Sequence, residues 1–307
     1  MAKQPTVPIT TTPKGIMTAL GAFIIWGGFP LYFKQLQQYD AIEIIVHRIV
    51  WTCVCLLIFM LMTRRFSWVK ILRQQPKWLL ITVFSGFIIT SNWLTYVWAV
   101  NANQILAASL GYFISPLVGV ALSMLVFHER LRPLQWLAIA IASVAVMIQV
   151  AMLGSLPWVS LVLAASFGVY GIMQRKTPLA AVDALFLETI AILPVCLLWL
   201  FQADVASSQL SFWWSNDIGF LMLAGPITLV PLLLFNKSTK MVAYSVLSFM
   251  NYLSPSFIFL LAVFYYHEPF DHQRLIVFVL IWLGLVVFSV DLWRHRPSKK
   301  TSKKTLA

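Results

Sequence analysis

Glu43, His47 and Arg48 place three ionisable side chains within six residues of an otherwise apolar run. Glu43 and His47 are one helical turn apart and share a helix face. If the run crosses a membrane, each charged group near its centre costs about 2.5–3.5 kcal/mol, so such groups are functional candidates by default. The three could bind an anion or carboxylate beside a histidine that titrates near neutral pH. The alternative is an interhelical salt bridge that only holds the segment in place.

A second isolated acid, Glu188, lies in a run that is apolar from Ala184 to Phe201 apart from Thr189. It could carry protons or provide the counter-charge of Arg48. The alternative is a hydrogen bond to backbone that nearby Pro194 leaves open.

Two apolar runs carry the same polar stripe, with a serine, a second polar residue and a proline at positions i, i+3 and i+7 of one helix face. The stripes are Ser109, Tyr112 and Pro116 in one run and Ser248, Asn251 and Pro255 in the other. Each proline frees a carbonyl that needs a partner among neighbours, water or a ligand. We therefore predict that both stripes face one wet central cavity. Tight packing through serine and glycine faces is the alternative.

Aromatic and amide side chains in neighbouring runs extend this prediction to a lining suited to amphipathic or planar solutes. The predicted substrate-binding or coupling residues are Glu43, His47, Arg48, Asn92, Trp93, Tyr96, Asn101, Ser109, Tyr112, Tyr170, Glu188, Ser248, Asn251 and Tyr252. The sequence contains no HExxH, GxSxG or P-loop motif, and its three cysteines lie inside apolar runs. We expect no catalytic residue, no metal site and no cofactor.

The elements that carry these residues follow from composition. Of 307 residues 60% are hydrophobic and only 10% are charged, whereas soluble domains have about 25% charged residues. A membrane helix needs about 20 apolar residues. The predicted spans are 15–35, 41–62, 78–99, 104–126, 134–152, 157–174, 182–201, 217–236, 243–264 and 274–293. This composition excludes a disulfide scaffold, a nucleic-acid-binding domain and an ordinary soluble enzyme.

The two halves of the chain resemble each other. A shift of 139 residues superimposes the two polar stripes and also His128-Glu129 on His267-Glu268. Because each half has five spans, the second half enters the membrane from the opposite side. We predict an all-α membrane protein with ten transmembrane helices as two inverted five-helix repeats. Its parts are an N-terminal tail (1–14), a first repeat (15–152), a second repeat (157–293) and a basic C-terminal tail (294–307).

Basic residues predict the orientation, because they gather on the cytoplasmic side of membrane proteins. With a cytoplasmic N-terminus, all 22 Lys and Arg residues except Lys34, Arg48 and Arg274 fall on the inner side. Both termini are therefore expected in the cytoplasm. The repeated His-Glu ends could act as gates at the two mouths, or could simply anchor helix ends among headgroups.

The duplicated five-helix unit resembles the EamA repeat of the drug/metabolite transporter superfamily, and several strings resemble its RarD family of bacterial inner-membrane permeases. The strings are Trp26-Gly27, Tyr32-Phe33-Lys34, Glu43-x-x-x-His47-Arg48-x-x-Trp51, Asn92-Trp93, Trp98-Ala99-Val100-Asn101, Ser109-Leu110-Gly111-Tyr112-Phe113-Ile114-x-Pro116 and Ser166-Phe167-Gly168-x-Tyr170-Gly171. The chain departs from the pattern at Ala107, where an acid is expected, and at Asn251, where glutamine is expected. RarD-like proteins are associated with chloramphenicol insensitivity, which implies export of small metabolites or drugs.

Inverted repeats with a site near mid-membrane are typical of alternating-access carriers. We therefore expect a secondary transporter of the bacterial inner membrane that exports small organic solutes, with protons as a candidate coupling partner. Contact with membrane lipid is expected and contact with nucleic acid is not; the oligomeric state stays open. The alternatives are a membrane-embedded enzyme or lipid-handling protein that uses Glu43, His47 and Arg48, and a channel.

Overall fold

The computed structural model describes residues 11–64, 66–102, 104–154, 158–214, 218–267 and 272–295. Across these ranges the chain is helical and has no strand. The α-helices are α1 (Pro13–Gly27), α2 (Phe29–Phe33), α3 (Ala41–Thr63), α4 (Ser67–Gln74), α5 (Lys77–Asn101), α6 (Ile105–Phe127), α7 (Pro133–Leu153), α8 (Trp158–Lys176), α9 (Ala181–Gln202), α10 (Ile218–Ser238), α11 (Tyr244–Met250), α12 (Leu253–Leu260) and α13 (His272–Arg294). Short 3-10 segments cover Lys34–Leu36, Ala206–Ser208 and Leu210–Trp214, and Leu261–Tyr265 is a π-helical turn.

Nine helical segments in the described part of the chain are long and apolar enough to cross a membrane. The remaining predicted span is α8, which has 19 residues and ends in Arg175 and Lys176. It is about 28 Å long at 1.5 Å per residue. The prediction of an all-α membrane protein is confirmed, with nine spans by this criterion and α8 as the tenth long helix in a predicted span.

Local sequence signals set several helix ends. Asp40 caps α3, because its side-chain Oδ1 accepts hydrogen bonds from the backbone N–H groups of Ile42 and Glu43 at 2.8 and 3.3 Å. Thr12 caps α1 in the same way, with Pro13 in the first turn. The predicted span over 243–264 corresponds to the candidate membrane span Tyr244–Tyr265, which a turn at Asn251 and Tyr252 divides into α11 and α12.

The chain forms two compact units, and each unit takes helices from both sequence halves. The smaller unit covers 130–155 and 269–307 and contains α7 and α13, which pack against each other. In it Arg132 Nε donates to Asp291 Oδ2 at 2.7 Å, and His295 Nδ1 lies 3.3 Å from Asp291 Oδ1. Asp291 thus connects the start of α7 to the end of α13.

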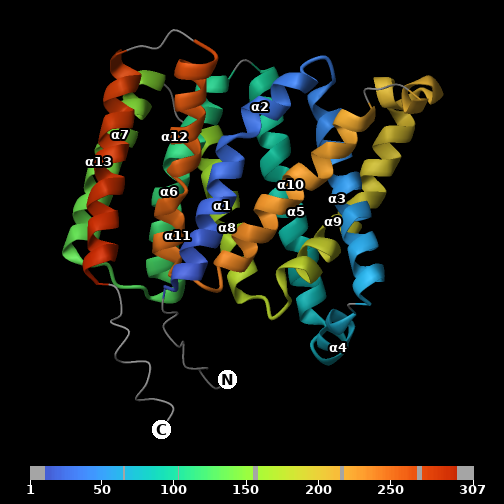
Figure 1. Cartoon of the computed structure of the whole chain (residues 1–307), viewed down its shortest axis with the longest axis horizontal. Helices are drawn as coiled ribbons and strands as arrows, with labels where there is room; N and C mark the ends of the chain where they lie inside the picture. The colour runs from blue at the N-terminus through green and yellow to red at the C-terminus, as the bar shows by residue number, and fades with distance from the viewer. Residues whose placement is uncertain are drawn as a thin grey trace. The chain divides into compact units, whose positions relative to one another are not determined.

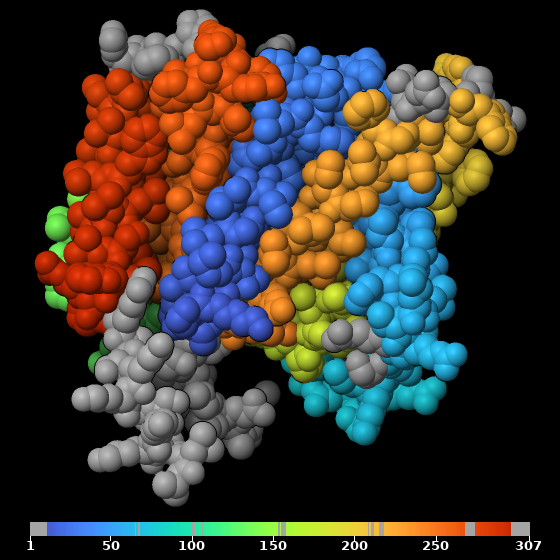
Figure 2. All heavy atoms as spheres, in the orientation of Figure 1, coloured from blue at the N-terminus to red at the C-terminus, as the bar shows by residue number. Residues whose placement is uncertain are grey.

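The larger unit covers 1–129 and 156–268 and contains all the other helices. In it α1 packs on α10 and α12 (Figures 1 and 2), and α8 packs on α5 and α6. In the sequence duplication the equivalent helices are α1 and α8, α3 and α9, α5 and α10, and α6 and α11–α12. When each helix is replaced by its equivalent, the contacts of α1 with α10 and α12 become the contacts of α8 with α5 and α6. The pairs α3–α9 and α6–α11 convert into themselves. The helix packing therefore follows the sequence duplication.

The direction of the helices shows that the two halves are inverted. At one end of the larger unit, Thr12 N–H donates to the Met241 carbonyl at 3.1 Å. At the same end Arg175 Nη1 donates to the Val242 carbonyl at 2.9 Å. Thus α1 starts where α8 ends, and the equivalent helices of the two halves run in opposite directions.

Candidate functional site in the helical core

Arg48 lies where four elements of the larger unit meet. Its Nε donates to Thr228 Oγ1 on α10 at 2.9 Å. Its guanidinium carbon lies 4.5 Å from the ring centroid of Trp93 on α5 and 5.4 Å from that of Phe33 on α2. No carboxylate of the described residues lies within ion-pair distance. Ring faces and one neutral hydroxyl therefore hold this cation in place, and its two terminal nitrogens face no described hydrogen-bond partner.

Glu43, His47 and Arg48, which the sequence groups into one candidate anion site, have different surroundings. Glu43 is 1% exposed, and its Oε1 accepts a hydrogen bond from the backbone N–H of Ser207 at 2.8 Å. Trp51 Nε1 donates to His47 Nδ1 at 3.1 Å, whereas His47 Nε2 has no described hydrogen-bond partner. No hydrogen bond or ion pair among the described residues joins Glu43 or His47 to the guanidinium of Arg48, and the joint anion site stays a prediction.

Glu188 is the centre of a separate buried polar network. It accepts hydrogen bonds from Gln174 Nε2 and from the Tyr170 hydroxyl, the latter at 3.4 Å. Gln174 Nε2 also lies 3.2 Å from Ser85 Oγ, and Asn236 Nδ2 donates to the Tyr170 hydroxyl at 3.0 Å. Glu188 is thus neither the counter-charge of Arg48 nor a partner of backbone near Pro194. The network joins α5, α8, α9 and α10 around one carboxyl group.

Tyr96 and Tyr112 form an accessible aromatic pair next to Arg48. Their ring centroids are 5.9 Å apart, and 37% of Tyr96 and 42% of Tyr112 are exposed. Tyr112 and Tyr32 lie within electrostatic range of Arg48. The rings of Tyr96 and Tyr112 are thus partly accessible.

Other predicted lining residues have structural partners. Asn92 Nδ2 donates to the Leu163 carbonyl and to Ser166 Oγ, both at 2.8 Å, and so joins α5 to α8. Tyr170 is fully buried. The side chain of Asn101 lies outside the described residues.

The two polar stripes have different surroundings, and this overturns the expectation of one shared wet cavity. Ser109 is exposed. Ser248 packs so closely on Gly119 that a Cβ there would lie 2.4 Å from its Oγ. The space around Ser248 and Asn251 is about 10 Å³, which is at the lower limit for one water molecule. Tyr252 is fully buried and donates its hydroxyl to the Phe113 carbonyl at 3.0 Å.

A polar cluster joins the helices at the end of the larger unit where α1 begins. Glu129 Oε1 accepts from Tyr244 N–H at 2.7 Å, and Oε2 accepts from the N–H and hydroxyl of Ser245 at 2.9 and 2.7 Å. Arg175 Nη2 lies 3.3 Å from Glu129 Oε1, and its guanidinium lies 4.5 Å from the Phe127 ring centroid. The carboxylate thus connects α6 and α8 to the start of α11. We call Glu129, Arg175, Tyr244 and Ser245 the end cluster.

Comparison with known proteins gives the family. The model of the EamA-like transporter family matches the chain twice, over residues 13–151 and 156–290. The chain belongs to this family. It is 48% identical to an uncharacterized transporter of Pseudomonas aeruginosa, covering 92% of this chain and 95% of that protein. It is 38% identical to Protein RarD of Escherichia coli K12, covering 94% and 98%.

A more distant relative is the chloramphenicol-sensitive protein RarD of Pseudomonas aeruginosa, 26% identical over 91% of this chain and 94% of that protein. One crystal structure of a protein shares 20% identity, with a TM-score of 0.68 over 92% of this chain and 98% of the other, and so shares the fold. This EamA-like chain is therefore a multi-pass membrane transporter of the RarD group.

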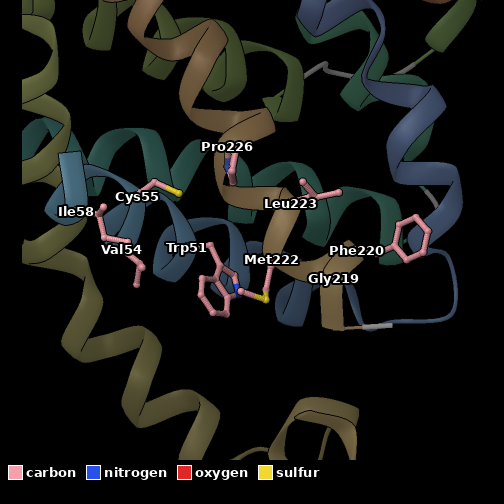
Figure 3. Close-up of a pocket in the computed structure, with 9 residues that line it drawn as sticks. All are labelled: Trp51, Val54, Cys55, Ile58, Gly219, Phe220, Met222, Leu223 and Pro226. Atoms are coloured by element: carbon pink, nitrogen blue, oxygen red, sulfur yellow. The ribbon is translucent and has the colours of Figure 1, made fainter. Parts of the chain in front are cut away.

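This EamA-like transporter has an apolar groove between α3 and α10, with a volume of about 570 Å³ (Figure 3). Its lining residues are Trp51, Val54, Cys55, Ile58, Gly219, Phe220, Met222, Leu223 and Pro226. Glu43, His47 and Arg48 are not among them. In the described part of the chain no three His, Cys, Asp or Glu residues could hold a metal ion.

The residues that the sequence analysis missed are neutral or lie at helix ends. Arg48 donates to Thr228, and the network around Glu188 includes Gln174 and Asn236. Glu129 accepts hydrogen bonds from the backbone of Tyr244 and Ser245. A polar residue in the middle of an apolar run was the available signal for the first three. For Tyr244 and Ser245 the signal was their position at the start of a predicted span.

Proposed function

We propose that this chain is a secondary transporter that exports small organic metabolites or drugs across the bacterial cytoplasmic membrane by alternating access. The observation that carries the proposal is the unequal environment of two equivalent serines. Ser109 is exposed, whereas Ser248 packs on Gly119. The next stripe positions repeat the difference, because Tyr112 is 42% exposed and Asn251 only 8%.

In an inverted repeat, the unequal exposure of the two polar stripes implies a conformational change between the halves. If each half took the conformation of the other, Ser248 and Asn251 would become accessible and Ser109 and Tyr112 would be packed. That exchange opens the protein at its opposite end, which is alternating access. The break between α11 and α12 at Asn251 provides a flexible point for this change.

The distribution of charge supports an assignment of the two ends to the two sides of the membrane. Besides the end cluster, the same end carries Lys176 and Lys240, and α4 with Lys70 packs there against α9. An end rich in Lys and Arg is expected in the cytoplasm. On this assignment the conformation is closed on the cytoplasmic side, and the exposed Tyr112 belongs to the outward path. The relative named as a chloramphenicol-sensitive protein supports a drug or metabolite as cargo.

Cysteine accessibility tests the proposal. Ser109→Cys and Ser248→Cys are placed singly in a chain whose Cys53, Cys55 and Cys196 are replaced by alanine. In right-side-out vesicles a membrane-impermeant maleimide should label position 109 and spare position 248. Adding Glu129→Gln should open the cytoplasmic end, so that position 248 becomes labelled in inside-out vesicles while labelling at 109 falls. Labelling that is unchanged at both positions contradicts alternating access. Metabolite release from cells with and without the gene then tests the direction of transport.

A further inference from the structure

The partly exposed cation at Arg48 lacks a negative partner within the described chain. The hydroxyl of Thr228 and the faces of Trp93 and Phe33 orient its guanidinium but do not neutralise its charge. A full charge among membrane helices is costly, and such residues pair with an opposite charge or mark a substrate path. A negative group must therefore come from outside this part of the chain.

The two acids that the sequence offered as partners are committed to other groups. Glu43 accepts from the backbone of Ser207, and Glu188 accepts from Gln174 and Tyr170. Neither can reach Arg48 without leaving those bonds. A ligand can therefore supply the negative charge that neutralises Arg48.

The geometry of the guanidinium defines the ligand's charged group. Only Nε of Arg48 is hydrogen-bonded to a described residue, which leaves the Nη1 and Nη2 donors free. These donors form a planar fork that matches the oxygens of a carboxylate or a phosphate. The hydroxyls of Tyr96 and Tyr112 also have no described hydrogen-bond partner. Both tyrosines are partly exposed, and their hydroxyls offer further donors.

The surroundings of the fork define the rest of the ligand. Trp93 provides an aromatic face under the guanidinium, and Tyr96 and Tyr112 provide two more rings with 37% and 42% of their surface accessible. Aromatic surfaces of this kind bind planar or apolar groups. A solute that satisfies both features has one anionic end and one apolar or aromatic body.

We propose that Arg48 is the specificity-determining residue of this transporter and binds the anionic group of small amphipathic organic anions, with carboxylates as the first candidates. The proposal rests on the proposed function and names its substrate class. Tyr96, Tyr112 and Trp93 hold the apolar body. A cell interior that is electrically negative favours the outward movement of such an anion, in agreement with export.

Equilibrium binding tests this with the purified full-length chain in lipid nanodiscs. The probes are phenylacetate, phenyl phosphate and the neutral phenylacetamide, and the signal is tryptophan fluorescence, since Trp93 lies against the guanidinium. The wild type should bind phenylacetate at least about tenfold more tightly than phenylacetamide. Phenyl phosphate, compared in parallel, tells whether the fork selects carboxylates or accepts any oxyanion.

Three variants test whether Arg48 causes the preference for phenylacetate over phenylacetamide. Arg48→Gln should remove the preference for the acid over the amide, and Arg48→Lys should keep part of it, because lysine retains the charge without the planar fork. Arg73→Gln, which removes an exposed charge on α4, is the matched control and should bind like the wild type. If Arg48→Gln fails to fold, Thr228→Val and Tyr112→Phe replace it and should each reduce the preference by about threefold.

The outcomes separate this proposal from the proposed function. Equal affinity for acid and amide, a preference that survives in Arg48→Gln, or no saturable binding of either anion up to about 10 mM overturns the assignment of Arg48. Flux assays in proteoliposomes address the transporter itself. Flux of neutral solutes without anion preference contradicts only the substrate class, whereas anion binding with no flux of any solute contradicts only the transport function.

Discussion

Arg175 Nη2 lies 3.3 Å from Glu129 Oε1, so that the last turn of α8 in the second half is joined to the end of α6 in the first. The same guanidinium covers the ring of Phe127. The sequence duplication places Lys34 at the position equivalent to Arg175 and Tyr266 at the position equivalent to Phe127. Lys34 Nζ in fact lies 3.6 Å from the Tyr266 ring centroid. At each end of the larger unit, a cation of one half therefore lies over an aromatic ring of the other half.

Weakening the end cluster should open the cytoplasmic end. Glu129→Gln removes a charge that pairs with Arg175 and accepts bonds from the start of α11. Hydrogen bonds to charged groups contribute about 1.5–3 kcal/mol each, so we expect a population shift of about tenfold or more toward the inward-open state. The measurement is the labelling rate of Ser248→Cys in inside-out vesicles. Arg130→Gln, at the adjacent residue, is the control and should leave the rate unchanged.

The equivalent change at the other end should have a smaller effect in the same direction. Lys34→Gln removes the cation from the Tyr266 ring but leaves the end cluster intact. Because Lys34 is exposed, its contact contributes only about 0.5–1 kcal/mol. The contact is formed in the conformation in which Ser109 is exposed, so its loss should lower the labelling of Ser109→Cys from outside by about two- to fivefold, the equivalent of that free energy. A rise in this rate would mean that the contact does not stabilise this conformation.

The sequence was sufficient for the helices and for the inversion, and insufficient for the pairing of charged side chains. Apolar runs separated by charges mark membrane helices by length alone. The grouping of Glu43 with Arg48 used their spacing on one helix, whereas the partner of Glu43 is Ser207, which lies 164 residues away. Such pairings depend on how helices pack, which spacing along one helix does not determine. The unequal surroundings of Ser109 and Ser248 were unpredictable for a similar reason, since equivalent positions in two sequence repeats can pack against different neighbours.

Glu188 is predicted to be the coupling group of the transporter. Glu188→Gln keeps an oxygen that can accept from Gln174 and Tyr170 but removes the titratable proton. We expect a well-folded variant whose solute flux no longer drives proton movement, measured with a pH-sensitive dye inside proteoliposomes. Glu188→Leu, by contrast, leaves buried donors unsatisfied and should destabilise the protein by about 1–3 kcal/mol per donor. Unchanged proton movement in Glu188→Gln would exclude this carboxyl group from coupling.

The crossing of α3 and α10 is predicted to tolerate no side chain at Gly225. A Cβ there would lie 2.5 Å from the backbone carbon and the Cβ of Trp51 and 2.7 Å from the backbone nitrogen of Thr52, so α3 would have to move. Such overpacking costs about 1–3 kcal/mol, and Gly225→Ala should lower the thermal unfolding temperature of the purified protein. Gly219→Ala is the matched control, because the same helix has open space around that position. Since α3 also carries Arg48, Gly225→Ala should weaken phenylacetate binding as well, while Gly219→Ala should leave both stability and binding near the wild-type values. Equal unfolding temperatures for the two variants would mean that α3 and α10 do not approach each other this closely.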